Sequence, residues 1–309
     1  MQEHGGDIYT NEGLVDFSAN INPLGPGEKV MEALKKSLEN VTAYPDPKCR
    51  ALREAAAKKE ATVSEHIICG NGAADLIYTM VLAEKPKRAL LCTPSFSEYE
   101  KALRTVDCRI RFHERKEEEG FALTRRYLDE LTEDLDMIFL CSPDNPTGQC
   151  VEESLLLEIV ETCEKKKIRL VLDECFLDFT EDGPWTHHEL LIRENRMLFL
   201  LRAFTKMFSI PGVRSGYGVC SDTGLLERMQ KVQTAVGRIC PGAGGGDGGA
   251  CRRSASGGHK TADCRRAASY HGRIYPDGNP VLPGKCQLHF VLQRNRFLRR
   301  DETRRISDP

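Results

Sequence analysis

The sequence has no long hydrophobic segment and no recognisable signal pattern at its start. No apolar run approaches the length of roughly 18 residues that a membrane-spanning helix needs. The opening MQEHGGDIYT lacks a basic stretch followed by an apolar one. The 309 residues have a formal net charge of −2, which gives no overall attraction to nucleic acid or membranes. We therefore expect a cytoplasmic protein that binds neither.

The 13 cysteines include no CxxC pair. Several lie in or beside apolar runs, namely Cys69, Cys92, Cys141 and Cys175. This scatter favours reduced thiols in a core over a disulfide framework or a zinc site, so no metal centre is predicted.

Glutamate nearly disappears after residue 234, where Glu302 is the only one. Residues 1–234 contain 30 Lys and Arg against 40 Asp and Glu, whereas residues 235–309 contain 14 against 6. Glycine crowds into GAGGGDGG, which lacks the spacing of a dinucleotide fingerprint. The composition after residue 234 resembles a disordered basic tail, and helical periodicity ends there.

Before this break, helix-like and strand-like segments alternate. Helical periodicity appears over residues 28–41, 49–60, 74–85, 97–106, 123–135 and 154–167. Short apolar runs, typical of buried strands, occupy residues 66–70, 88–94, 136–143, 168–174 and 196–204. The pattern predicts an α/β fold with a mostly parallel sheet and helices on both faces. Ligands bind at the carboxyl edge of such sheets.

Each predicted strand ends in residues suited to chemistry: GNGAAD, PSFSEY, PDNPTG, Asp173-Glu174 and Thr205-Lys206. Lys206 follows a wholly apolar run, and a buried lysine readily becomes a nucleophile for carbonyl groups. A carboxylate such as Asp173 would keep the ring nitrogen of a carbonyl cofactor protonated. Each residue has an ordinary structural alternative: Asp173 suits a turn or helix cap, and Asn145 suits a turn. Together they indicate a pyridoxal phosphate site.

Residues 1–234 resemble the fold type I aminotransferase family along nearly their whole length. The resemblance rests on GNGAAD, PSFSEY, CSPDNPTG, VLDECFLDF and LRAFTKMFSIPGVRSGYG, which occur in the family's order. It implies that Lys206 is the Schiff-base lysine and that Asp173 partners the pyridine nitrogen of the cofactor. It also implies that Asn145 reaches the phenolic oxygen and that Phe96 stacks on the ring.

The resemblance further implies a phosphate site and a homodimer. The phosphate site comprises Gly72, Ala73, Ala74, Thr205 and Arg214. Tyr44, in AYPDP, matches a tyrosine that reaches the cofactor of the partner subunit.

Two branches of the family share these motifs: histidinol-phosphate aminotransferases and threonine-phosphate decarboxylases. HGGDIY followed by DFSANINPLGP resembles the decarboxylase opening more closely, and Phe176 stands where the aminotransferases usually have tyrosine. This resemblance implies a small phosphorylated amino acid as substrate, decarboxylated in cobalamin biosynthesis, with Asn22 nearby and His4 contacting its phosphate. The alternative functions are a histidinol-phosphate aminotransferase-like transaminase and an inactive remnant of either enzyme. For His4, the alternative is a mobile N-terminal residue without a contact to substrate. His187 and His188 lie in a polar stretch and are expected to face solvent.

The resemblance divides the chain into three parts. Residues 1–44 form an N-terminal arm and part of a small domain, residues 45–234 form the cofactor-binding large domain, and residues 235–309 form an anomalous tail that leaves the small domain incomplete. The family's Pro-Trp and Pro-Ala-Gln segment and its carboxylate-binding arginine are missing. A one-base shift in back-translated QTAVGRICPGAGGG permits RRPWAVSVPAQAAG, so we interpret the tail as the product of a reading-frame shift. The alternative is a genuine basic tail for nucleic acid or acidic partners.

Overall fold

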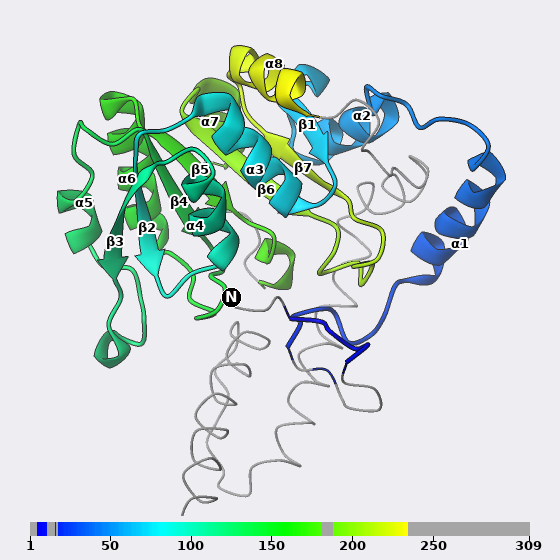
Figure 1. The fold of residues 1–309 in the computed structure, drawn as a ribbon, viewed down its shortest axis with the longest axis horizontal. Coiled ribbons are helices and arrows are strands. Elements are labelled where there is room, and N and C mark those ends of the chain that lie inside the picture. The colour runs from blue at the N-terminus through cyan, green and yellow to red at the C-terminus, as the bar shows by residue number, and fades with distance from the viewer. Residues whose placement is uncertain (1–4, 11–15, 17, 181–187, 234–309) are drawn as a thin grey trace, which may run out of the picture.

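A seven-stranded sheet runs through the centre of the chain (Figure 1). The computed structural model describes residues 5–10, 16, 18–180 and 188–233, so the predicted tail and His4 lie outside the described residues. The strand order is β1-β7-β6-β5-β4-β2-β3, and β7 is antiparallel to both of its neighbours. The strands are β1 (Ile67–Gly70), β2 (Arg88–Thr93), β3 (Arg109–Glu114), β4 (Met137–Cys141), β5 (Arg169–Asp173), β6 (Leu198–Ala203) and β7 (Gly216–Val219).

All five predicted strands are present, and the prediction of a mostly parallel α/β sheet is confirmed. Sequence patterns missed β3 and β7. The edge strand β3 is mostly exposed and reads RIRFHE, so it lacks an apolar run. The short strand β7 reads GYGV, and its glycines resemble turn residues.

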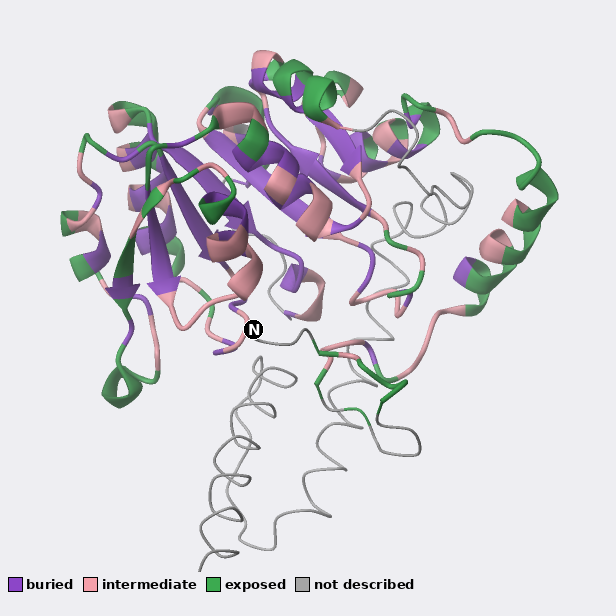
Figure 2. Cartoon of the chain, in the orientation of Figure 1, coloured by how far each residue is buried: buried purple, intermediate pink, exposed green. Residues whose placement is uncertain are grey.

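Helices cover both faces of the sheet, as predicted, and the strands between them are buried (Figure 2). One face packs against α2 (Arg50–Lys59), α5 (Arg126–Asp129), α6 (Glu153–Lys166) and α7 (His188–Glu194). The other face packs against α3 (Ala73–Glu84), α4 (Ser97–Arg104) and α8 (Thr223–Val232). Alternate residues of β1, β2, β4, β5 and β6 supply the two cores, as the two-residue repeat of a strand requires.

The helix predicted over 123–135 is largely wrong, because only α5 forms there. Tyr127, Leu131 and Leu135 are buried at four-residue spacing, which imitates one face of a helix. Turns connect them instead, and the Leu135 N–H donates to the Thr132 carbonyl at 3.1 Å.

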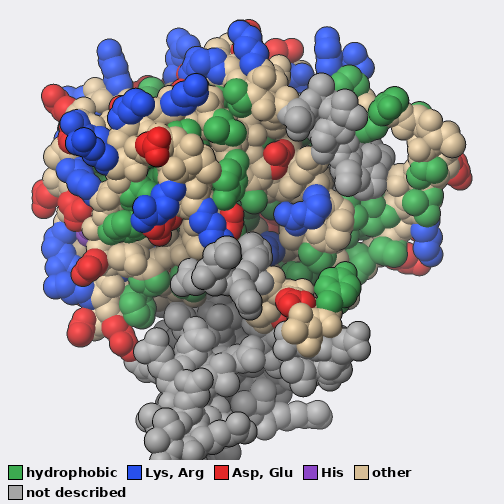
Figure 3. All heavy atoms as spheres, viewed as in Figure 1, with side chains coloured by type: hydrophobic (Ala, Val, Ile, Leu, Met, Phe, Trp, Pro, Cys, Tyr) green, Lys and Arg blue, Asp and Glu red, His purple; other side chains and the backbone are tan. Residues whose placement is uncertain are grey.

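The N-terminal arm projects from the sheet and its helices (Figure 1). It carries α1 (Glu28–Ser37) and a 3-10 turn, η1 (Leu38–Asn40). Hydrophobic side chains gather along this arm, whereas basic and acidic side chains are interspersed over the rest of the visible face (Figure 3). Leu38, Val41 and Tyr44 are 65%, 72% and 88% exposed. Within the described part of the chain, every helix is too short or too polar to cross a bilayer.

The predicted core thiols are confirmed for the four cysteines named above. Cys69, Cys92, Cys141 and Cys175 are all buried, and no disulfide joins any two described cysteines. Burial raises the pKa of the Cys92 thiol to about 12, so this group stays protonated at neutral pH.

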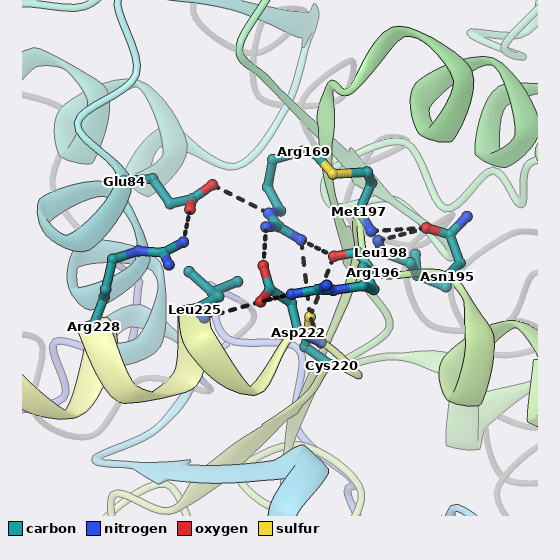
Figure 4. Close-up of polar contacts among 10 residues, drawn as sticks. All are labelled: Glu84, Arg169, Asn195, Arg196, Met197, Leu198, Cys220, Asp222, Leu225 and Arg228. Atoms are coloured by element: carbon teal, nitrogen blue, oxygen red, sulfur yellow. Dashed lines mark hydrogen bonds and ion pairs between the residues drawn. The ribbon is translucent and has the colours of Figure 1, made fainter.

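A buried ion cluster joins helices α3 and α8 to the amino end of β5 (Figure 4). Arg169, whose side chain is 3% exposed, approaches Asp222 at 3.0 Å and Glu84 at 3.2 Å. Asp222 also caps α8 by accepting from the Leu225 N–H at 3.2 Å. Burial raises the pKa of Asp222, but hydrogen bonds, chiefly from Arg196, outweigh it and hold the pKa below its usual value.

Replacing Arg169 by methionine should lower the free energy of unfolding by about 3–5 kcal/mol, because two carboxylates lose a buried cationic partner. Urea unfolding measures this loss. As a control, Arg50→Met removes an exposed cation that pairs with Asp46, and should cost less than about 1 kcal/mol. Equal losses in the two variants would contradict a structural role for the buried cluster.

Candidate cofactor-binding site at the carboxyl edge of the sheet

Lys206 lies just beyond β6, where the strand reaches the carboxyl edge of the sheet. Its residue is partly buried, and its Nζ atom lies 5.7 Å from the centre of the Phe176 ring. Burial lowers the pKa of the Lys206 amine, and the positive charge of Arg214 lowers it further. A larger fraction of the amine is therefore neutral and nucleophilic at neutral pH than in an exposed lysine.

Asp173 ends the neighbouring strand β5 and is 4% exposed. Its carboxylate accepts from the Tyr99 hydroxyl at 2.7 Å and from the Cys175 N–H at 2.9 Å. Burial raises the pKa of Asp173 despite these two hydrogen bonds. A positively charged ring nitrogen beside this carboxylate would favour its ionised form.

The first turn of α3, Arg214 and the start of β7 meet closely. Gly72 has φ +86°, and a Cβ atom there would lie 2.9 Å from a terminal nitrogen of Arg214. A Cβ atom on Gly216 would lie 3.2 Å from the Ala73 nitrogen and 2.8 Å from the Arg202 carbonyl oxygen. Glycine at these two positions therefore lets a guanidinium approach the free N–H groups that begin a helix, an arrangement suited to a phosphate.

Two further loops end at the same edge of the sheet. Phe96 immediately precedes α4, and its ring meets Tyr99 edge-on with centroids 5.5 Å apart. Asn145 follows β4 in the loop PDNPTG and is partly buried. Thr205, next to the lysine, is 7% exposed. The loops therefore bring an aromatic ring, an amide and a hydroxyl to the edge of the sheet that carries Lys206 and Asp173.

These residues fit pyridoxal phosphate in charge and chemistry. The set offers an amine of lowered pKa for the aldehyde, a buried carboxylate for the ring nitrogen, and a cationic helix N-terminus for the phosphate. The Lys206 amine interacts electrostatically with both Asp173 and Arg214, so the amine, carboxylate and phosphate-binding groups are close together. The structure thus brings together Asp173, Gly72 and the pair Lys206 and Arg214 from three separate segments.

Asn22 lies against the backbone that follows the lysine. It is 5% exposed, and its N–H donates to the Lys206 carbonyl at 3.1 Å. Its side-chain amide donates to the Met207 carbonyl at 3.0 Å, and its amide oxygen accepts from Leu24. Asn22 therefore anchors the N-terminal arm beside the site, and its predicted contact with substrate stays a prediction.

The remaining predicted residues are placed differently. Tyr44 lies on the arm and is 88% exposed, and its predicted role toward a partner subunit stays a prediction. His4 and His187 lie outside the described residues. Ala74 lies in the first turn of α3, beside Ala73.

The expectation that His188 faces solvent is wrong. Its residue is 4% exposed, and its Nε2 atom lies 3.3 Å from a Glu174 carboxylate oxygen and 3.1 Å from a terminal nitrogen of Arg202. Arg202 also approaches Glu174 at 3.0 Å and Glu60 at 3.4 Å, and Tyr217 donates to Glu60 at 2.6 Å. This network ties β5, β6 and β7 together close to Asp173 and Lys206.

The sequence analysis assigned no role to Tyr99, although this residue lies in the motif PSFSEY. Burial and the nearby Asp173 raise its pKa well above the usual value, so it remains a hydrogen-bond donor to that carboxylate. Its place three residues after Phe96 predicts that Tyr99 lies one helical turn from that ring. The sequence gives no sign of its partner Asp173, which is 74 residues further along the chain.

The parallel sheet, the two helical layers and the lysine at a strand end define an α/β enzyme of the fold type I architecture. Residues 12–238 match the model of the family described as aminotransferase class I and II, and the chain belongs to this family. The match ends shortly beyond position 234, where the composition changes.

Two curated relatives represent the two branches. The chain is 40% identical over 238 residues to the threonine-phosphate decarboxylase of Salmonella typhimurium, covering 74% of this chain and 65% of that protein. It is 30% identical over 235 residues to histidinol-phosphate aminotransferase 2 of Archaeoglobus fulgidus, covering 75% and 65%. The chain thus spans slightly less than two thirds of the length of these relatives.

Solved structures show the same fold. The L-threonine-O-3-phosphate decarboxylase of Porphyromonas gingivalis superimposes with a TM-score of 0.63 at 26% identity, covering 75% of this chain and 68% of that one. The histidinol-phosphate aminotransferase of Sinorhizobium meliloti, a complex with pyridoxal-5'-phosphate, superimposes with a TM-score of 0.70 at 19% identity, covering 82% and 69%.

In the cofactor-free protein, Lys206→Met should raise the free energy of unfolding at pH 7. The folded-state pKa of Lys206 is lowered, so its charged form carries a penalty below that pKa, and the penalty disappears as pH rises past the unfolded value of about 10.4. Urea unfolding at pH 7 and about pH 10.5 should show a gain that shrinks with pH. The exposed Lys231→Met serves as control, and a gain independent of pH would contradict the assignment.

Proposed function

We propose that this chain binds pyridoxal 5'-phosphate and decarboxylates L-threonine O-3-phosphate in cobalamin biosynthesis. The observation that carries the proposal is the 40% identity to a threonine-phosphate decarboxylase, against 30% to a histidinol-phosphate aminotransferase over a similar length. The buried thiols also suit the reducing conditions of the cytoplasm, where we expect the protein to act.

The bound cofactor would supply the electron sink for the bond broken at the substrate Cα. Lys206 would hold the cofactor through its amine, and Asp173 would retain a proton on the ring nitrogen. The N–H groups of Ala73 and Ala74, with Thr205 and Arg214, would bind the phosphate, and Gly72 would leave room for the Arg214 guanidinium. Phe96 would cover the ring and Asn145 would donate to its phenolic oxygen.

The choice between decarboxylation and transamination depends on which Cα substituent stands perpendicular to the ring, because only that bond overlaps the π system. Contacts to the substrate's other groups set this orientation. Phe176, next to the Lys206 amine, has no hydroxyl and therefore offers no hydrogen bond where a tyrosine would. This difference favours the decarboxylase over the alternative, a histidinol-phosphate aminotransferase-like reaction.

Borohydride reduction after incubation with pyridoxal phosphate should place the cofactor on the peptide containing Lys206. The variant Lys206→Ala should lose this label, and Lys231→Ala, an exposed control, should retain it. Attachment elsewhere, or none to folded protein, would overturn the proposed cofactor site.

With L-threonine O-3-phosphate as substrate, carbon dioxide and an aminopropanol phosphate are the expected products, whereas a keto product would favour the aminotransferase.

We further propose that a reading-frame shift near codons 230–234 produced residues 235–309. The end of the family match at residue 238 supports this, as does the loss of glutamate beyond residue 234. In the same shifted frame, back-translated residues 285–309 permit SANFILFFKGTDFLEEMKRDGFLIR. That reading restores an apolar run followed by an acidic, helix-patterned segment, as is typical of the chain before the break.

The 309-residue chain should therefore attach the cofactor yet turn over L-threonine O-3-phosphate more slowly than about 1 s⁻¹, the low end for enzymes. The matched comparison is the same gene with one base restored near codon 233, which should recover turnover. Nucleotide sequencing there tests the shift directly. Equal turnover from the two genes at or above that rate would contradict it.

A homodimer is proposed from the exposed apolar arm. Leu38, Val41 and Tyr44 expose hydrophobic surface on a segment that projects from the sheet and its helices (Figure 3). Size-exclusion chromatography with light scattering should show a dimer. Val41→Glu should weaken it at least about tenfold, because a charge would be buried in the interface. Val63→Glu, at another exposed valine, should leave it intact, and a monomeric parent chain would contradict the proposal.

A further inference from the structure

Arg115 is a buried arginine that follows the edge strand β3 and does not belong to the predicted cofactor site. Its side chain is 4% exposed, and its guanidinium lies 2.9 Å from the carboxylate of Asp144, whose side chain is 3% exposed. The same terminal nitrogen also donates to the Pro94 carbonyl. The Arg115 N–H donates to the Thr93 carbonyl at 3.0 Å, which ties the residue to the end of β2.

The two partners of this guanidinium belong to two different loops of the site. Pro94 lies just before Phe96, and Asp144 immediately precedes Asn145. Because β2 lies between β3 and β4, Arg115 reaches across the end of one strand to the loop of the next, about 10 Å at the usual strand spacing. Figure 1 shows β3, β2 and β4 side by side at one end of the sheet.

Asp144 also organises its own loop. Its carboxylate accepts from the Thr147 hydroxyl at 2.7 Å and from the Thr147 N–H at 3.1 Å. Its carbonyl accepts from the Gly148 N–H at 2.8 Å, and its N–H donates to the Gln149 carbonyl at 2.9 Å. The charge that Arg115 neutralises therefore sits at the centre of the turn that carries Asn145.

We propose that Arg115 is a positioning residue that fixes the loops bearing Phe96 and Asn145 relative to each other, over and beside the cofactor ring. This role rests on the proposed function. An arginine suits it because one terminal nitrogen of the planar guanidinium carries two N–H donors at a fixed angle, and this nitrogen contacts both the Asp144 carboxylate and the Pro94 carbonyl. A lysine side chain is one bond shorter and its ammonium group rotates freely, so Arg115→Lys keeps the charge but loosens one of the two loops.

The expected consequence is spectroscopic. A hydrogen bond from Asn145 to the phenolic oxygen stabilises its anion, which then holds the neighbouring proton of the lysine-bound cofactor less tightly. Displacing Asn145 should therefore raise the pKa read from the cofactor's absorbance during a pH titration. A change confined to stability or overall packing would leave that pKa unchanged.

Spectrophotometric titration should compare the parent chain, Arg115→Lys, Asn145→Ala and the double variant, all loaded with pyridoxal phosphate. Arg115→Lys should raise the pKa by at least about half a unit, and the double variant should match Asn145→Ala alone, because both changes act through one hydrogen bond. Arg169→Lys is the matched control: it alters a buried arginine paired with an aspartate at 3.0 Å at the opposite end of β5. It should lower stability and leave the pKa unchanged.

A second measurement needs no cofactor. In cofactor-free Arg115→Lys, the amides of Thr147 and Gly148 should exchange with solvent at least about tenfold faster, while those of α8 keep their rates.

An unshifted pKa, additive shifts in the double variant, or unchanged exchange would overturn the positioning role. A parent chain that attaches no pyridoxal phosphate at Lys206 would overturn the proposed function itself, which separates the two failures. Failure of Arg115→Lys to fold, while Arg169→Lys folds, would make Arg115 a residue of stability and also overturn the role.

Discussion

The structure depends on the parallel alignment of five strands, β2 to β6, of which all but the edge strand β3 are buried. Parallel strands point their carboxyl ends the same way, so residues that follow each strand are brought to one edge although they are far apart in sequence. Asp173 ends β5 and Lys206 lies just after β6, yet the two side chains interact electrostatically at this edge. The interior of the sheet is almost entirely apolar, so polar groups can be tolerated only at its two ends.

The two ends use buried charge in opposite ways. At the amino end of β5, Arg169 is surrounded by Asp222 and Glu84 at distances of 3.0 and 3.2 Å, and these opposite charges compensate each other. At the carboxyl end, burial disfavours the charged forms of both Lys206 and Asp173, whose pKa values move in opposite directions. Such groups, whose burial outweighs the effect of their partners, cost stability and are typical of sites that bind a ligand of complementary charge.

Further buried ion pairs connect the strands and loops around the proposed site. Arg202, in β6, joins Glu60, Glu174 and His188, and burial lowers the pKa of Arg202 less than the two carboxylates raise it. Arg115 joins the loops on the other flank through Asp144. Each network links residues from at least three segments, so the chain beside Asp173, Phe96 and Asn145 is held by charged groups outside the proposed cofactor site.

The sequence alone determined the α/β class and five of the seven strands, and it led to the prediction of a site at the carboxyl edge with Lys206 and Asp173. These follow from local patterns, because an apolar run and the polar residue after it are adjacent in the chain. Only the tertiary structure decided that His188 is buried, that Tyr99 donates to Asp173 and that Arg115 joins two loops. Those facts depend on which strand lies beside which. The partners come from separate elements of the chain, and Tyr99 and Asp173 are 74 positions apart, beyond the reach of any local pattern.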